Sequence, residues 1–144
     1  MRTILLIMIG ISSLVGGDFT RNANGVVIDS RTNLEWQDDY SDNSKKIKEA
    51  TWQDAIDYCE SLTLDGHTNW RLPNVNELIS LLDYYSKQQP LIDASFENTY
   101  SNYYWSSSSE AKLHNYVWII HFYYGYQYSN TKNKKNSVRC VRRL

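Results

Sequence analysis

Histidine, serine and cysteine are the side chains of this sequence that could take part in catalysis. His67, His114 and His121 lie far apart, and no Gly-x-Ser-x-Gly, His-Glu-x-x-His or glycine-rich phosphate loop accompanies them. His121 falls inside a predicted strand, where a structural role is expected. The serines at 106–109 have no base beside them and are interpreted as a loop at the end of a strand. We therefore predict no catalytic residues.

The two cysteines, Cys59 and Cys140, form an even pair. In an exported protein such a pair indicates a disulfide. The bridge would close a loop of about 80 residues and contribute about 4 kcal/mol by the chain-entropy argument. Two buried free thiols remain the alternative. A zinc site is disfavoured, because two cysteines without a nearby histidine do not complete a ligand set.

The first 17 residues have the pattern of a secretory signal peptide. Arg2 precedes an apolar run over Ile4–Val15, and small residues follow before Asp18. The run is shorter than the roughly 18–20 residues that span a bilayer. We expect residues 1–17 to be removed, which leaves a single domain over 18–144. Its location would be periplasmic, secreted or at the cell surface, with membrane contact only through the signal peptide.

Aromatic residues favour a binding function. The chain has 12 Tyr and 5 Trp but only 3 Phe, and eight of the tyrosines lie between Tyr100 and Tyr128 among Ser and Asn. This mixture is typical of recognition surfaces, and aromatic faces also stack on sugar rings. Tyr103, Tyr124 and Tyr126 lie near predicted turns and are the surface candidates. The alternative is ordinary packing within a sheet.

The C-terminal segment is locally basic, although the whole chain has a formal net charge of −1, which argues against a nucleic-acid binder. From Thr131 onward there are no acidic residues. A patch of this kind could hold the sulfate or carboxylate groups of a polyanion, or be a solvated tail. The six basic residues are Lys132, Lys134, Lys135, Arg139, Arg142 and Arg143.

An acidic loop offers a weaker option, calcium. Asp38, Asp39, Asp42 and Asn43 supply oxygen ligands, but their spacing does not match an EF-hand. A solvated acidic loop is the simpler interpretation, and we expect no metal or other cofactor.

The pattern of elements predicts an α+β fold, because the helices come early and the strands late. A hairpin is expected over 25–37. One helix begins at Thr51 with Asp54 as a capping partner, and a second begins at Asn74 with Glu77. Strands are expected over 116–123, 126–129 and 137–142, the first of them covered on both faces, with Trp118 and Phe122 in the core.

Taken in order, several motifs resemble one known family, the Lcl C-terminal domain of a bacterial collagen-like adhesin. They cover nearly the whole of the predicted mature chain. The matching segments are Asp29–Gln37, Thr51-Trp52 with Ala55 and Cys59, Asn69–Asn74 with Glu77-Leu78, Tyr104–Ser107, Trp118–Gly125 and Val138–Arg142.

The resemblance implies a C-type-lectin-like fold, with two helices packed on one twisted antiparallel sheet. It also implies a disulfide from the first helix to the last strand, which here joins Cys59 to Cys140. It further implies an adhesin-like module that binds glycosaminoglycan or other carbohydrate. The collagen-like stalk of the adhesin has no counterpart here, so homo-oligomerisation stays open.

Two other functions remain open on this resemblance. The domain could be the head of an envelope or adhesin protein that binds another protein, either in the envelope or on a host surface. The wider fold superfamily also contains oxidases that generate formylglycine, but that chemistry requires accessible thiols.

Overall fold

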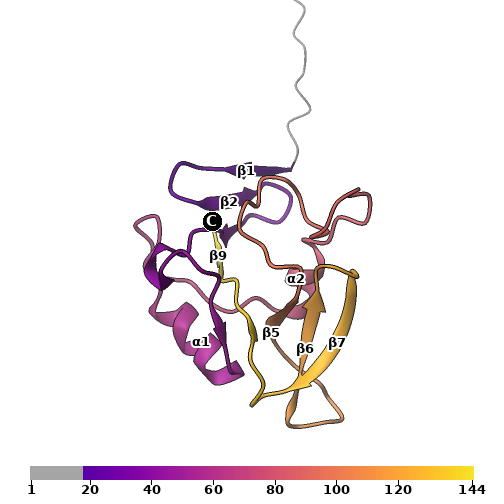
Figure 1. Ribbon diagram of the computed structural model, residues 1–144. Helices are drawn as coiled ribbons and strands as arrows, with labels where there is room; N and C mark the ends of the chain where they lie inside the picture. The colour runs from indigo at the N-terminus through magenta and orange to yellow at the C-terminus, as the bar shows by residue number, and fades with distance from the viewer. Residues whose placement is uncertain (1–17) are drawn as a thin grey trace, which may run out of the picture.

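The computed structural model describes residues 18–144, which form two β-sheets and two helices (Figure 1). The predicted signal peptide, residues 1–17, lies outside the described residues. The first sheet has the order β1-β2-β3-β9 and is antiparallel throughout. Its strands are β1 (Phe19–Arg21), β2 (Val26–Asp29), β3 (Leu34–Gln37) and β9 (Val141–Arg143). The predicted hairpin is confirmed as β2 and β3.

The second sheet has the order β4-β8-β5-β6-β7. Its pairs are antiparallel except for one parallel bridge between β5 and β8, where Tyr104 lies opposite Ser137. The strands are β4 (Glu49–Ala50), β5 (Tyr103–Ser109), β6 (Tyr116–His121), β7 (Tyr126–Thr131) and β8 (Asn136–Ser137). The strand β7 forms one edge of this sheet.

Two helices pack on the second sheet: α1 (Trp52–Ser61) and α2 (Val75–Ile79), with a 3-10 turn, η1, at Ser41–Asn43. The capping box predicted for α2 is confirmed: the Asn74 side chain accepts from the Glu77 N–H at 2.8 Å, and the Glu77 carboxylate accepts from the Asn74 N–H. The cap predicted for α1 is wrong, because the Thr51 side chain makes no capping bond. Neither helix is long and apolar enough to cross a membrane, within the described residues.

The expectation of one sheet is wrong, and the C-terminal segment shows why. Residues 137–142 do not form one strand: β8 pairs in the second sheet, and β9 pairs in the first. Between them, Val138 donates to the Lys48 carbonyl at 2.8 Å, and the Cys140 carbonyl accepts from Gln37 at 2.9 Å. The segment therefore crosses from one sheet to the other with its backbone paired on the way. The α+β class, the two helices and the single disulfide are confirmed.

The core lies on both faces of β6. Ile119 packs in a cluster with Cys59 of α1, whereas Ile120 packs in a second cluster with Leu78 of α2 and Trp36 of β3. Phe122 is buried as predicted, but Trp118 is only half-buried. The period-two alternation of β6 thus sends successive side chains to opposite layers, which explains why both sets are apolar.

The serines at 106–109 belong to β5 and not to a loop. The register of β5 against β6 shifts between Trp105 and Ser109, as at a β-bulge. Ser106 is buried and its hydroxyl donates to the Trp118 carbonyl at 2.6 Å, while the Ser108 hydroxyl accepts from the Val75 N–H at 3.0 Å. Both hydroxyls have structural partners, which is what lets serine continue the strand.

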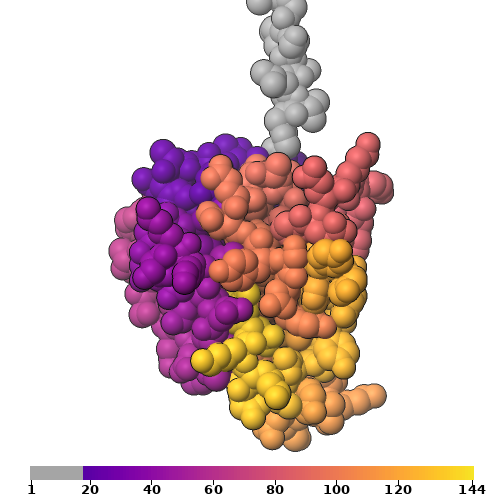
Figure 2. All heavy atoms as spheres, viewed as in Figure 1, coloured from indigo at the N-terminus to yellow at the C-terminus, as the bar shows by residue number. Residues whose placement is uncertain are grey.

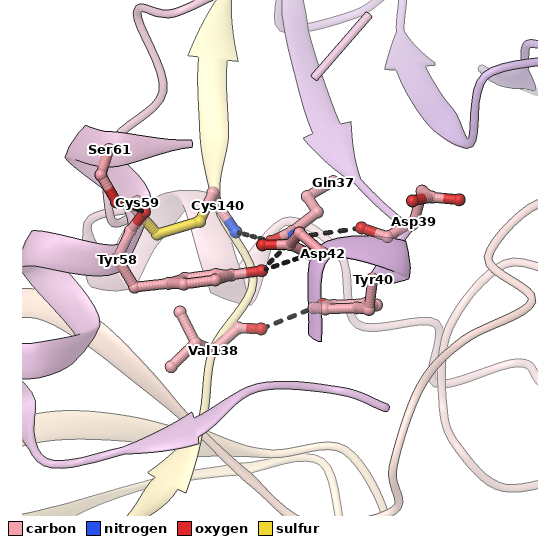
Figure 3. The surroundings of a disulfide bond; sticks show 9 residues. All are labelled: Gln37, Asp39, Tyr40, Asp42, Tyr58, Cys59, Ser61, Val138 and Cys140. Carbon is pink, nitrogen blue, oxygen red and sulfur yellow. Dashed lines mark hydrogen bonds between the residues drawn. A yellow bond between two sulfur atoms is a disulfide. The ribbon is translucent and has the colours of Figure 1, made fainter. Parts of the chain in front are cut away.

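The disulfide joins α1 to the crossing segment, as predicted (Figure 3). Cys59 and Cys140 are fully buried, with their Cα atoms 5.4 Å apart. The Gln37 side chain ties β3 to the same place: its amide nitrogen donates to the Tyr58 hydroxyl at 2.8 Å, and its oxygen accepts from the Cys140 N–H at 3.2 Å. The bridge therefore fixes α1, β3 and the crossing segment together.

Removal of the bridge should destabilise the protein strongly. The bond spans 81 residues, so the chain-entropy argument predicts a loss of about 4–5 kcal/mol in the double variant Cys59→Ala/Cys140→Ala. Urea unfolding of the oxidised protein and of this variant measures the difference. A loss below about 1 kcal/mol would show that the packing around α1 alone holds the crossing segment.

Candidate ligand-binding surface

Six aromatic side chains gather on β5, β6 and β7 and on the turn between β6 and β7; we call them the tyrosine surface. In the ladder, Tyr103 lies opposite His121, and His121 lies opposite Tyr126. Residues directly opposite in an antiparallel ladder share a face, so these three side chains are neighbours. The full set is Tyr103, His121, Tyr123, Tyr124, Tyr126 and Tyr128.

The rings contact one another in a continuous series. Tyr103 meets His121 edge-on, with ring centroids 4.3 Å apart. His121 and Tyr126 are near-parallel at 5.7 Å, and Tyr124 and Tyr126 are near-parallel at the same distance. The hydroxyls of Tyr103 and Tyr126 are hydrogen-bonded at 3.0 Å. The series therefore combines apolar ring faces with phenolic hydroxyls.

Most of this surface is open to solvent. Tyr124 is 63% exposed and Tyr128 is 59% exposed, whereas His121 beneath them is 8% exposed. The hydrogen bond with Tyr126, together with burial, raises the pKa of Tyr103 to about 12. This hydroxyl is therefore neutral at physiological pH. A ligand placed here would meet uncharged donors and acceptors on an aromatic base.

The turn that carries Tyr123 and Tyr124 is held from below by His121. The Nδ1 atom of His121 accepts from the backbone N–H groups of Tyr123 and Tyr124, at 3.1 and 3.3 Å. Gly125 completes the turn with φ +72°, and its carbonyl accepts from the Tyr84 hydroxyl at 2.7 Å. An added Cβ at Gly125 would lie 2.7 Å from the Tyr84 ring, so only glycine fits.

His121 must therefore be unprotonated at Nδ1 for the turn to keep these bonds. Burial lowers its pKa below the ordinary histidine value. The structural role predicted for this histidine is thus one of positioning exposed tyrosines. Tyr123 and Tyr128 were not among the sequence candidates. Tyr126 and Tyr128 are spaced i, i+2 and so share one face of a strand, and this spacing could have identified Tyr128 from the sequence.

The lysines lie at the other end of β7. Lys132 and Lys134 line a shallow cavity of about 410 Å³ with Asn115, and the Lys132 ammonium sits 4.5 Å from the Trp52 ring centroid. Lys134 and Lys135 are exposed. Lys132 lies six residues after Tyr126 along the extended chain, which corresponds to a separation of about 20 Å. The tyrosines and lysines therefore do not form a single compact site.

Two of the predicted basic ligands are not at the surface. Arg139 is fully buried, and Arg142 is 8% exposed. Arg142 pairs with Glu35 across β3 and β9 and donates to the Asn69 side chain at 2.9 Å. Arg143 is exposed, but it lies on β9 in the first sheet. The basic patch expected from the sequence is thus divided. Two arginines are internal, and only the three lysines remain together.

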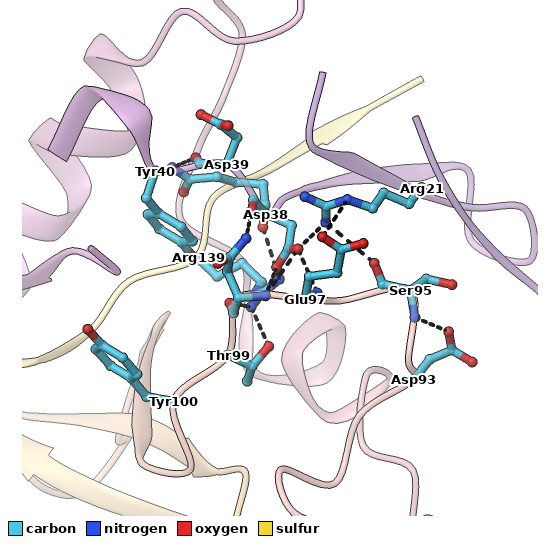
Figure 4. A network of polar contacts seen from close by, with 12 residues as sticks. Arg21, Asp38, Asp39, Tyr40, Asp93, Ser95, Glu97, Thr99, Tyr100 and Arg139 are labelled. Atoms are coloured by element: carbon cyan, nitrogen blue, oxygen red, sulfur yellow. Dashed lines mark hydrogen bonds and ion pairs between the residues drawn. The ribbon is translucent and has the colours of Figure 1, made fainter. Parts of the chain in front are cut away.

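Arg139 sits in a buried polar network (Figure 4). Its guanidinium donates to the Asp38 carboxylate at 2.9 Å, and to the Asn98 carbonyl and Thr99 hydroxyl at 2.6 and 2.7 Å. Asp38 also accepts from the backbone N–H of Glu97 at 2.8 Å. The pair therefore fastens the segment before β5 to the core. Figure 2 shows this segment, in orange, spread over the surface between the N-terminal half and the C-terminal strands.

Burial opposes the charge on Arg139, but its contacts with Tyr40, Asp38 and Tyr104 more than offset this, so its pKa is raised above the ordinary value. The guanidinium is also 4.7 Å from the Phe96 ring centroid. Arg139 is thus an internal cation.

The acidic loop that was considered as a weaker option for calcium has its carboxylates directed to separate partners. Asp38 pairs with Arg139 and Arg21, Asp39 accepts from Ser41, and Asp42 accepts from the Tyr58 hydroxyl at 3.2 Å. Within residues 18–144 there is no group of three or more His, Cys, Asp or Glu side chains placed to hold a metal ion.

A family profile described as Lcl C-terminal domain matches residues 25–142. The chain belongs to this family. The match confirms the resemblance noted in the sequence, and it covers both helices and the strands from β2 to Arg142 of β9 in the Lcl C-terminal domain described above. No protein of curated function matches the chain at a significant level.

The motif Asn69–Asn74, which carried part of the resemblance, builds the frame of this Lcl C-terminal domain. Arg71 pairs its backbone with Val141, both bonds being 2.9 Å, and its guanidinium meets the Glu77 carboxylate at 2.7 and 2.8 Å. The Trp70 indole donates to the His67 carbonyl at 3.1 Å. These residues therefore hold α2 and β9 in place and lie outside the tyrosine surface.

Acid should weaken this domain through His121. Its pKa is lowered on folding, so the unfolded chain binds the proton first as the pH falls through about 6.5. Stability is then complete above that pH and declines below it, with loss of the bonds to Tyr123 and Tyr124. NMR titration of the imidazole and of these two amides should show the same midpoint. Titration of His121 at or above pH 6.5 would contradict the prediction.

Breaking the buried ion pair should cost more than a surface pair. Arg139→Met leaves the buried Asp38 carboxylate with Arg21 as its remaining ion-pair partner among the described residues, so we expect a loss of about 3–5 kcal/mol. Arg143→Met, which changes an exposed arginine four positions along, should cost less than about 1 kcal/mol. Equal losses in the two variants, measured by chemical denaturation, would show that the internal pair is not critical.

Proposed function

We propose that this protein is an exported, adhesin-like module that binds carbohydrate through the tyrosine surface. The observation that carries the proposal is the continuous series of solvent-exposed rings on β5–β7, joined by hydrogen-bonded hydroxyls. Membership of the Lcl C-terminal domain family supports an adhesin-like binding role. Export is supported by the pattern of residues 1–17 and by the buried disulfide, a bond typical of oxidising compartments.

The chemistry of the surface suits a sugar. A pyranose ring has an apolar face of C–H groups and a rim of hydroxyls. The faces of Tyr124 and Tyr126 offer apolar area, and their hydroxyls, with that of Tyr103, offer neutral hydrogen-bonding partners. Tyrosine also loses little side-chain entropy on binding, because only two torsions must be fixed. Stacking combined with hydrogen bonding would orient the sugar ring.

The lysines favour an acidic polysaccharide over a single sugar. An extended glycan seated on the tyrosine surface and running along β7 would reach Lys132, Lys134 and Lys135 about 20 Å away. Its carboxylate or sulfate groups would meet cations there, while the rings fix its orientation at the other end. The electrostatic part of such binding would be weakened by salt.

A non-catalytic role is part of this proposal. Both sulfurs are joined and fully buried, which argues against the accessible thiols that a formylglycine-type oxidase requires. The disulfide from the first helix to the segment before the last strand, and the presence of the first and last strands, β1 and β9, in one sheet, support the C-type-lectin-like fold that we propose for the domain.

Truncation of the exposed rings should weaken recognition. The double variant Tyr124→Ala/Tyr126→Ala removes two contacting rings, so its affinity for any glycan retained on an array should fall by at least about tenfold. Tyr85→Ala is the matched control, because Tyr85 is 96% exposed but outside the tyrosine surface. Loss of binding in both variants, or in neither, would contradict the assignment.

The charge of the ligand is tested by retention on heparin. Retention on heparin should fall with salt and weaken in Lys134→Ala/Lys135→Ala, while binding to neutral glycans should not change. If no glycan on the array were bound, and an envelope or host protein were captured in a way that depends on Tyr124 or Tyr126, the domain would instead be a protein-binding head.

A further inference from the structure

The outer edge of β7 is an unpaired strand edge. Just after β6, the Phe122 N–H donates to the Asn102 carbonyl beside β5, and within β6 the carbonyls of Tyr116 and Trp118 also face β5. The backbone groups of Val117, Ile119 and His121 therefore face β7, because directions alternate along a strand. Their partners in the register are Asn130, Tyr128 and Tyr126. It follows that the backbone N–H and C=O groups of Gln127, Ser129 and Thr131 point away from the sheet.

Only part of this edge is satisfied locally. The Thr131 N–H donates to the Asn130 side chain at 2.9 Å, and its carbonyl accepts from Lys134 at 3.1 Å. The N–H and C=O groups of Gln127 and Ser129 have no protein partner among residues 18–144. These four groups form a short template for another strand.

The edge of β7 also lacks the devices that protect natural edges. The other terminal strands, β1, β4 and β9, have three, two and three residues, whereas β7 has six. It contains no proline and no charged residue, and its register against β6 runs without a shift. Proline, inward charges, bulges and shortness are the usual means of blocking an edge. None of them is found within β7.

We propose that β7 pairs with β7 of a second copy of this chain, antiparallel about a twofold axis at Tyr128. In this register Gln127 lies opposite Ser129 of the second copy, and Ser129 lies opposite its Gln127. All four free backbone groups are then hydrogen-bonded. Tyr128 faces Tyr128 of the second copy in a non-hydrogen-bonded pair, where side chains approach most closely.

The sequence of β7 is complementary to itself in this register. Tyr126 lies opposite Asn130, and Lys132 just beyond the strand lies opposite Tyr124, so no like charges meet. A strand of a different protein could use the same four groups, but the pairing of Tyr128 with itself selects a second copy. The twofold axis would place two tyrosine surfaces on the same side of one continuous sheet and so double the number of binding sites.

The test is the oligomeric state of the purified protein by analytical ultracentrifugation over a concentration series. The unchanged chain should show a monomer–dimer equilibrium. Ser129→Pro removes an outward N–H that β6 does not use, and it should shift the equilibrium at least about tenfold toward monomer. Ser129→Ala keeps that N–H and should remain dimeric. Circular dichroism, and the thermal midpoint measured at a concentration low enough for all three to be monomeric, should be alike, which separates loss of pairing from loss of fold.

A charge pair tests the register. Tyr128→Lys and Tyr128→Glu should each be monomeric, because like charges face each other across the axis, and an equal mixture should recover the dimer. A monomer at every concentration of the unchanged chain, or a Ser129→Pro variant as dimeric as Ser129→Ala, would overturn the proposal. Failure of glycan binding alone would leave these results unaffected, since they require no ligand.

Discussion

A buried guanidinium is the interaction on which the rest of this structure depends. Arg139 lies in the segment that crosses from β8 to β9, and it is held by the Asp38 carboxylate and by the segment before β5. A charge cannot be buried without such partners, because its hydration would otherwise be lost without compensation. The crossing segment, the end of β3 and the segment 96–99 must therefore assemble together, and the adjacent disulfide adds α1 to the same unit.

This arrangement separates the residues that build the domain from those that could bind. Arg71, Glu77, Arg139 and Arg142 are engaged in ion pairs within the domain, and they lie in or beside the motifs that identify the Lcl C-terminal domain. The tyrosine surface lies on β5, β6 and β7, at the end of β6 that carries His121. A rigid sheet carrying exposed rings on one side is a suitable support for recognition, since little order must be gained on binding.

The basic C-terminal segment illustrates why a run of charge along a sequence is not a patch in space. Lys132, Lys134 and Lys135 occupy a loop after β7, and Arg143 belongs to a different sheet. Arg139, in the crossing segment, and Arg142, on β9, enter the interior, where they pair with the carboxylates of Asp38 and Glu35. Glu35 and Asp38 come from more than 100 positions earlier in the chain, a distance over which sequence patterns carry no pairing information.

The sequence by itself determined the elements governed by local physics. These were the β2–β3 hairpin from alternation and turn residues, the Asn74–Glu77 capping box, the two-faced strand β6 and the bond between two cysteines in an apolar setting. Only the tertiary structure decided that residues 137–142 divide between two sheets, that two arginines are internal and that six aromatic rings meet. Those outcomes depend on contacts between distant segments, where burial and ion pairing outweigh the preferences of any short stretch of chain.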